Sequence, residues 1–369
     1  MIRSVAPSLA LALSVLACNS ILGNRPGHPI DDAGADAAAD VSPTSSCDDA
    51  PCPPVTLAAQ RDLPADLVVS SGFVYWIDQG TFANSGLDGV VVRVPIGGCA
   101  AGDASCPKLL AEHQDNPAGV AADANGVYWV TASTTALDGA AWRVAFDGSP
   151  PALLDKRQNH PRKLAVDDTS VYWVNAGDAP GNGEVRREFF DSTASIAIVG
   201  GQTSSVDVVV RDGLLYWTSY GDDDFTGYVA GSALDGTGVI RFAQNQAQPR
   251  GIAAGATFVY WANAGNGTIM RASRDGVDLR VLLADRNTPA DVAVDESGIY
   301  WVEAGSRPNF QDGVVVAARL DGTGVTVLAS GRKNPVAIAI DGPWIYWAER
   351  GTFGGDFHDG AIMKIQKPW

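Results

Sequence analysis

The stretch PADVAVDESGIYWVE, residues 289–303, contains the pattern that decides the fold. A proline opens an apolar run, and a Tyr-Trp pair follows eleven residues after it. The same dipeptide occurs seven times at steps of 40 to 53 residues, beginning at Tyr75, Tyr128, Tyr172, Tyr216, Tyr260, Tyr300 and Tyr346. The residue eleven positions before each tyrosine is Pro64, Pro117, Pro161, Ser205, Pro249, Pro289 or Pro335. A spacing held over seven copies predicts a repeat architecture.

Each repeat has the pattern of four short β-strands. In the unit that begins at Pro289, apolar runs cover residues 292–294, 299–302, 313–316 and 325–328. Such β-branched or aromatic runs, bounded by Gly, Asp or Pro, are typical of strands, and the Asp-Gly between the last two runs is a hairpin signal. The pattern predicts an all-β fold, a seven-bladed β-propeller of four-stranded blades, with a six-bladed ring as the alternative.

The two ends of the repeat region predict how the ring closes. After Trp347 the chain has one more strand pattern, residues 361–365, and no fourth strand. Residues 55–59 precede Pro64 in the way that other fourth strands precede their prolines. We therefore expect the N-terminal strand to complete the last blade of a propeller that spans residues 55–369. Within each pair, Tyr and Trp point to opposite faces, and burial of each contributes about 2 kcal/mol between blades.

The N-terminus predicts export. Residues 1–17 have the pattern of a signal peptide, with an apolar run too short to span a bilayer. The run ends in Val15-Leu16-Ala17-Cys18, which resembles a bacterial lipobox and implies cleavage before Cys18 and lipidation of its thiol. The residue after the cysteine is Asn19, which resembles the second residue of lipoproteins sent to the outer membrane. The sequence does not distinguish the periplasmic side of that membrane from the cell surface. An ordinary signal peptide is the alternative. Residues 18–54, rich in Asp and Ala, are predicted to be a disordered tether.

Charge and cysteines limit the partners and the compartment. The formal net charge of −16 argues against nucleic acid and against electrostatic docking on anionic lipid, so a membrane partner is expected only through the lipid anchor. Besides Cys18 the chain has four cysteines, which suits an exported protein. Cys99 and Cys106 flank a short loop of a predicted hairpin and are expected to form a disulfide. Cys47 and Cys52 are the remaining pair.

Three columns of repeat positions meet on the face where the loops between second and third strands vary most in length. Two residues after each aromatic pair stand Asp78, Thr131, Asn175, Ser219, Asn263, Glu303 and Glu349. Three before each proline position stand Arg61, Gln114, Gln158, Gln202, Gln246, Arg286 and Arg332. Two after it, at the expected channel mouth, stand Asp66, Gly119, Lys163, Asp207, Gly251, Asp291 and Ala337.

These columns have two interpretations. Repeated polar residues commonly bond loop backbone, and this is the expected role of the first two columns. The candidate binding face consists of charged and amide members of the three columns: Arg61, Asp66, Asp78, Asn175, Asp207, Asn263, Arg286, Asp291, Glu303, Arg332 and Glu349. The third column does not repeat chemically, so Asp66, Asp207 and Asp291 are candidates to hold a hard cation through oxygen ligands.

A family resemblance supports the architecture. Gly267-Thr268-Ile269-Met270-Arg271 and the run from Gly360 to Lys364 follow Tyr-Trp strands and, in the first case, precede Asp-Gly. This order resembles the YWTD repeat propellers of the low-density-lipoprotein-receptor type. The resemblance implies a binding scaffold rather than an enzyme. The chain departs from that family in its number of repeats, since the family has six, and in its bacterial lipoprotein leader.

Two functions from different classes follow. The first is a lipid-anchored scaffold of the cell envelope that binds a protein or a glycan through its variable face, with no catalytic residue and no cofactor. The second is a metal-dependent lactonase- or esterase-like hydrolase, resembling gluconolactonase-like propellers, with Ca²⁺ or another divalent cation at the channel mouth. The sequence has no phosphate loop, nucleophile elbow or zinc-site spacing. A structural envelope component without a small ligand is a third possibility.

Overall fold

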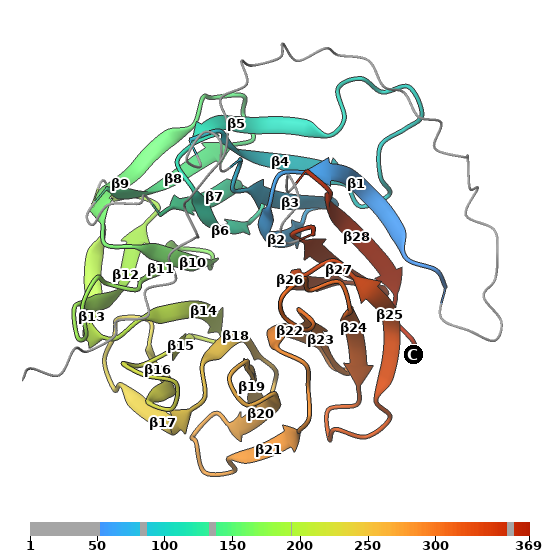
Figure 1. The fold of residues 1–369 in the computed structure, drawn as a ribbon. Coiled ribbons are helices and arrows are strands. Elements are labelled where there is room, and N and C mark those ends of the chain that lie inside the picture. Colours follow the sequence, from blue (N-terminus) through green and yellow to red (C-terminus); the bar gives the residue numbers. More distant parts are fainter. Residues whose placement is uncertain (1–51, 82–86, 133–137, 193, 353–357) are drawn as a thin grey trace, which may run out of the picture. The chain divides into compact units, whose positions relative to one another are not determined.

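The computed structural model describes residues 52–81, 87–132, 138–192, 194–352 and 358–369. These residues form seven four-stranded antiparallel sheets arranged around an axis (Figure 1). The seven-bladed propeller is therefore confirmed, and the six-bladed alternative is wrong. The signal peptide, Cys18 and most of the tether lie outside the described residues. Within the described part, no helix is long and apolar enough to cross a membrane.

The blades follow one another along the chain, and each is built outward from an inner strand (Figure 1). Blades 1 and 2 contain β2 (Pro64–Ser70), β3 (Phe73–Asp78), β4 (Gly89–Pro95), β5 (Lys108–Gln114), β6 (Pro117–Ala122), β7 (Gly126–Thr131), β8 (Gly139–Ala145) and β9 (Ala152–Gln158). Blades 3 and 4 contain β10 (Pro161–Val166), β11 (Ser170–Asn175), β12 (Gly183–Phe189), β13 (Ile196–Gln202), β14 (Ser205–Arg211), β15 (Leu214–Ser219), β16 (Gly227–Ala233) and β17 (Ile240–Gln246). Blades 5 and 6 contain β18 (Pro249–Ala254), β19 (Phe258–Asn263), β20 (Thr268–Ser273), β21 (Arg280–Leu283), β22 (Pro289–Val294), β23 (Ile299–Glu303), β24 (Gly313–Ala318) and β25 (Thr326–Arg332).

Blade 7 closes the ring as the sequence predicts. It contains β26 (Pro335–Asp341), β27 (Trp344–Glu349), β28 (Gly360–Gln366) and, as its outer strand, β1 (Val55–Arg61). Val55 pairs with Lys364 and Arg61 with Gly360 in an antiparallel register. The inner strand β2 contacts both β6 and β26, so the inner strands form an unbroken ring. The two ends of the propeller are thus held together by backbone hydrogen bonds.

The aromatic pairs form the core between blades. All seven tryptophans of the pairs are completely buried, and each of the seven tyrosines is at most 3% exposed. Tyr172 packs in one apolar cluster with Trp217 of the next blade, and Tyr216 packs likewise with Trp261. The same arrangement, tyrosine of one blade with tryptophan of the next, recurs at all seven junctions. The two faces of each Tyr-Trp strand therefore serve two different junctions.

Two local features complete the ring. The unit that has Ser205 in place of proline forms a full blade, in which the hydroxyl oxygens of Ser205 and Ser219 lie 3.0 Å apart. The disulfide between Cys99 and Cys106 is present in the hairpin between β4 and β5, with Cα atoms 5.6 Å apart. That disulfide prediction is confirmed. Cys47 lies outside the described residues, so its pairing with Cys52 stays a prediction.

Candidate functional site at the channel mouth

The loops expected to form the recognition surface meet at one end of the ring. Each inner strand begins opposite the end of the second strand, as in the pairing of Pro64 with Asp78 and of Pro335 with Glu349. The loops from the outer strand to the next inner strand, and from the second to the third strand, therefore share a face, which we call the proline face. Its longest second-to-third loops are residues 79–88, 304–312 and 350–359, which belong to the consecutive blades 1, 6 and 7.

These three long loops share a clamp at their base. The backbone N–H and hydroxyl of Thr81 donate to the carboxylate of Asp88 at 2.8 and 2.7 Å. Ser306 donates in the same way to Asp312, at 2.6 and 2.7 Å, and Thr352 to Asp359, at 2.8 and 2.7 Å. The preceding residues, Gly80, Gly305 and Gly351, have positive φ of 84°, 95° and 98°. A Cβ on Gly80 would lie 2.1 Å from Asp88 Oδ1, so the clamp requires glycine there. The sequence contains its signal, Gly-(Ser/Thr) followed by Asp-Gly, which sequence reasoning missed.

Where the column before the proline holds Gln, its side chain bonds across a blade junction. The Oε1 atom of each Gln accepts the indole N–H of the next blade's tryptophan, at 2.7 to 3.1 Å. The pairs are Gln114 with Trp129, Gln158 with Trp173, Gln202 with Trp217 and Gln246 with Trp261. Asn175 donates an amide N–H to the Oε1 atom of Gln158, and Asn263 donates one to the Oε1 atom of Gln246, each at 3.0 Å. These polar side chains join blades.

Where that column holds Arg, the partner column holds an acid. Arg61 Nε donates to Asp78 at 2.9 Å, while Arg286 and Arg332 form ion pairs with Glu303 and Glu349 at 3.6 and 3.5 Å. The same two glutamates accept the indole N–H groups of Trp301 and Trp347, each at 2.8 Å. Asp78, Glu303 and Glu349 are at most 5% exposed. Burial raises the pKa of Asp78 to about 6 even though Arg61 lowers it. These carboxylates lie within the junctions, and only their arginine partners reach solvent.

The channel-mouth aspartates lie together around an ammonium group. Lys163 Nζ is 2.5 Å from Asp66 Oδ1 and 3.7 Å from Asp291 Oδ2. Asp66, Asp207 and Asp291 each also accept a backbone N–H from the next blade, donated by Val120, Ile252 and Ile338 at 3.0, 3.1 and 3.1 Å. All four charged side chains line the axial channel, which has a cavity volume of about 340 Å³.

The protonation of this cluster follows from its burial. Burial raises the pKa of Asp207 to about 7 against the opposing effect of Lys163, and Asp291 and Asp66 raise it further. Burial also raises the pKa of Asp291 above its ordinary value. Among the residues that the structure describes, no group of three or more His, Cys, Asp or Glu is arranged to hold a metal ion. A divalent cation at Asp66, Asp207 and Asp291 would have to displace Lys163.

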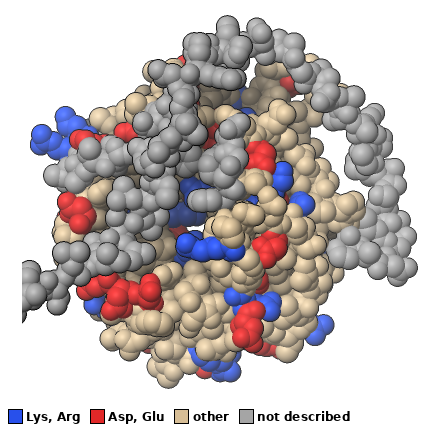
Figure 2. Space-filling model, viewed as in Figure 1, with Lys and Arg blue, Asp and Glu red and all other residues tan. Residues whose placement is uncertain are grey.

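Three arginines that sequence reasoning did not single out lie above this cluster. Arg162 and Arg250 are the second residues of β10 and β18, and Arg350 directly follows β27. Basic side chains border the opening at the centre of the face seen in Figure 2. Burial lowers the pKa of Arg350 to about 10, and the charges of Arg250 and Arg162 lower it further. The positive charges of Arg250 and Arg162 therefore act on Arg350.

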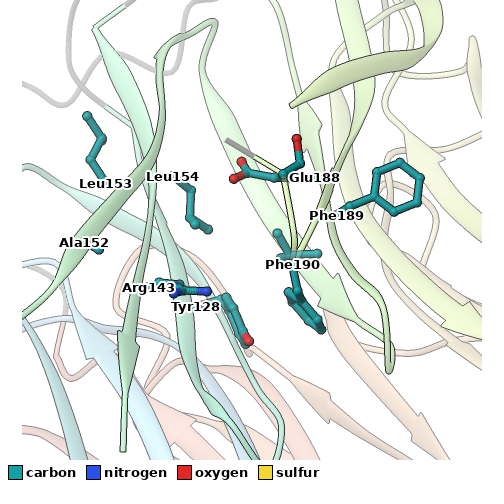
Figure 3. A pocket seen from close by; sticks show the side chains of 10 residues that line it. Tyr128, Arg143, Ala152, Leu153, Leu154, Glu188, Phe189 and Phe190 are labelled. Atoms are coloured by element: carbon teal, nitrogen blue, oxygen red, sulfur yellow. The ribbon is translucent and has the colours of Figure 1, made fainter. Parts of the chain in front are cut away.

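A second hollow, of about 220 Å³, lies between blades 2 and 3, away from the proline face (Figure 3). Tyr128 and Phe190 stack on one side of it, with ring centroids 5.6 Å apart. Glu188 is only 4% exposed, and its Oε2 atom has no hydrogen-bond partner among the described residues. Burial and the charge of Asp155 raise the pKa of Glu188 to about 7.

Comparison with known proteins agrees with this architecture. The family model for low-density lipoprotein receptor repeat class B matches residues 257–296. The chain is a β-propeller with YWTD-like repeats. No curated protein matches the sequence of this propeller.

The solved structures that are similar to the propeller include three with a TM-score of 0.50. The first, a chain of a nidogen/laminin complex, is 19% identical, with 66% of this chain and 90% of that chain covered and a TM-score of 0.50. A luciferin-regenerating enzyme is 13% identical, with 68% and 91% covered and a TM-score of 0.50. Regucalcin from Agrobacterium tumefaciens, described as a calcium-binding protein, is 13% identical, with 69% and 92% covered and a TM-score of 0.50. Identities this low show a shared fold alone.

Proposed function

We propose that this chain is an exported, lipid-anchored propeller scaffold that binds a protein or a glycan of the cell envelope through its proline face. The observation that carries the proposal is the repeated clamp on blades 6, 7 and 1. It holds the bases of the three longest loops in one geometry on three consecutive blades. Loops that a rigid scaffold holds in place commonly carry recognition.

The channel favours this function over metal-dependent hydrolysis. A hydrolase of that kind needs carboxylates that are free to bind a cation, and the cation must activate water. Here the three aspartates accept backbone N–H groups, and Lys163 lies among them. The similarity to regucalcin and to the luciferin-regenerating enzyme keeps hydrolysis as the second candidate on grounds of fold only.

Envelope binding provides the test. The chain from Asn19 to Trp369 is incubated with washed envelope fragments, and bound protein is measured after pelleting. We expect saturable binding that is lost when residues 351–359 are shortened to the length of the loop between β19 and β20. Shortening the loop of residues 176–182 on blade 3 is the control and should leave binding intact. Equal binding by both loop variants would contradict the proposal, as would lactone hydrolysis that depends on added Ca²⁺.

The lipid anchor has its own test. In bacteria that produce the full chain with a labelled fatty acid, the wild-type protein should carry label and fractionate with membranes. The Cys18→Ser variant should carry no label. Labelling that persists in this variant would contradict lipidation at Cys18.

A further inference from the structure

The three arginines at the channel mouth, Arg162, Arg250 and Arg350, differ from three other arginines of the proline face in their lack of an ion pair with a described carboxylate. Arg61, Arg286 and Arg332 on the same face each form an ion pair with an acid. In contrast, none of the ion pairs among the described residues includes Arg162, Arg250 or Arg350. The guanidinium of Arg350 donates to the neutral side chain of Gln79. The mouth is thus a basic site on a protein whose formal net charge is −16.

Hydrogen-bond donors in this site also lack acceptors. The Nε atoms of Arg250 and Arg350 are buried and have no hydrogen-bond partner among the described residues. A buried donor without an acceptor is destabilising, and like charges held together add to that cost. An oxyanion at the mouth would offset the repulsion between the like charges, because a guanidinium presents its N–H groups as a planar fork that fits carboxylate and phosphate oxygens.

The ring places these arginines on three different blades. They come from blades 3, 5 and 7, no two of which are neighbours. The three residues therefore lie at three separate positions around the axis. Below them, Asp66, Asp207 and Asp291 line the channel and would repel an anion that entered deeper. Any anion is consequently held at the mouth, on the proline face.

We propose that Arg162, Arg250 and Arg350 form a binding site for a multiply charged oxyanion, either a phosphate group or a cluster of carboxylates. The proposal rests on the function proposed above and deepens it, since it names the chemistry recognised at the centre of the same face. The phosphate or carboxylates could belong to a free small molecule or to a group carried by the envelope partner.

Calorimetric titration of the chain from Asn19 to Trp369 tests the site, with inorganic phosphate and citrate as probes at low ionic strength. We expect saturable binding of at least one probe, weakened at least tenfold in Arg162→Gln and in Arg250→Gln and reduced by added NaCl. Arg319→Gln, which removes an exposed arginine elsewhere, is the charge-matched control and should bind as wild type. Binding of phosphate alone would assign a phosphoryl ligand, and binding of citrate alone a polycarboxylate.

Folding and function are controlled separately. Arg162 is exposed, and its guanidinium forms no hydrogen bond within the described residues. We therefore expect Arg162→Gln to fold as wild type. This variant keeps the test decisive if Arg250→Gln unfolds. The absence of saturable binding of both probes, or equal binding by wild type and Arg162→Gln, would overturn the inference. If the loop-dependent envelope binding persisted in that case, the proposed scaffold function would stand. Anion binding without envelope binding would support the arginine site and contradict the proposed scaffold function.

Discussion

Replacement of Asp207 by Asn should change the pH dependence of stability in a defined way. Asp207 is 8% exposed and shares the channel with Asp66, Asp291 and a single ammonium group. Its carboxylate accepts backbone N–H groups from Val208 at 2.8 Å and Ile252 at 3.1 Å. Asparagine has the same shape but cannot ionise, and its amide provides only one oxygen. The variant therefore lacks the ionisable carboxyl group of Asp207 and one of the two hydrogen bonds that it accepts.

The magnitude follows from the pKa of Asp207, which is raised from 3.8 to about 7. Between these values the folded chain holds a proton that the unfolded chain releases. The stabilisation from this proton is fully present below the unfolded pKa and is lost as pH rises through the folded pKa. The loss amounts to about 4 kcal/mol at full ionisation and roughly 3 kcal/mol between about pH 4.5 and 7.5. The missing hydrogen bond costs about 1 to 3 kcal/mol at every pH.

The assay is urea unfolding of wild type and Asp207→Asn at half-unit steps over this pH range. The stability of the variant relative to wild type should rise by roughly 3 kcal/mol from low to high pH and level off above about pH 7. The constant offset from the hydrogen bond does not affect this slope. A difference between the two proteins that stays the same at every pH would refute the assigned protonation of the channel.

Three further predictions concern the ring. Gln202→Leu removes the acceptor of two buried donors, Trp217 and Tyr228, and should lower the free energy of unfolding by about 2 to 4 kcal/mol. Gln114→Leu removes the acceptor of one donor, Trp129, and should lower it by about half as much. Equal losses for the two variants in urea unfolding would contradict this prediction. A chain that starts at residue 62 lacks β1 and should fail to give a monomeric, cooperatively unfolding protein, while one that starts at residue 52 should succeed; gel filtration and thermal unfolding decide. The double variant Cys99→Ser and Cys106→Ser should lose about 2.5 kcal/mol, the loop entropy of a short bridge, and wild-type stability in that variant would count against it.

The repeat architecture could be predicted because its determinants are local in sequence. The interval from Pro289 to Tyr300 fixes one inner hairpin, and the pairing of Ala293 with Tyr300 shows that hairpin in the structure. Ring closure was predictable for the same reason, because residues 55–59 supply the one strand pattern missing after Trp347. Adjacent Tyr and Trp side chains likewise had to point to opposite faces of a strand.

The site was less predictable because it depends on distances across the ring. The sequence places Glu303 and Glu349 on a loop-rich face, but their burial between blades depends on the partners Arg286 and Arg332 from the preceding blade. Lys163 belongs to the same column as the aspartates, yet its position among them is set by the curvature of the ring. For the arginine site one signal was present. The residue after the proline position is Ala or Val in five repeats and arginine only at Arg162 and Arg250.

The most direct test of recognition at the channel mouth is a crystal structure of the chain from Asn19 to Trp369 grown with phosphate or citrate. We predict electron density for an oxyanion among the guanidinium groups of Arg162, Arg250 and Arg350, with oxygen atoms about 2.7 to 2.9 Å from their nitrogen atoms. A map in which these guanidinium groups instead pair with carboxylates of the chain itself, with only water at the mouth, would contradict the anion site.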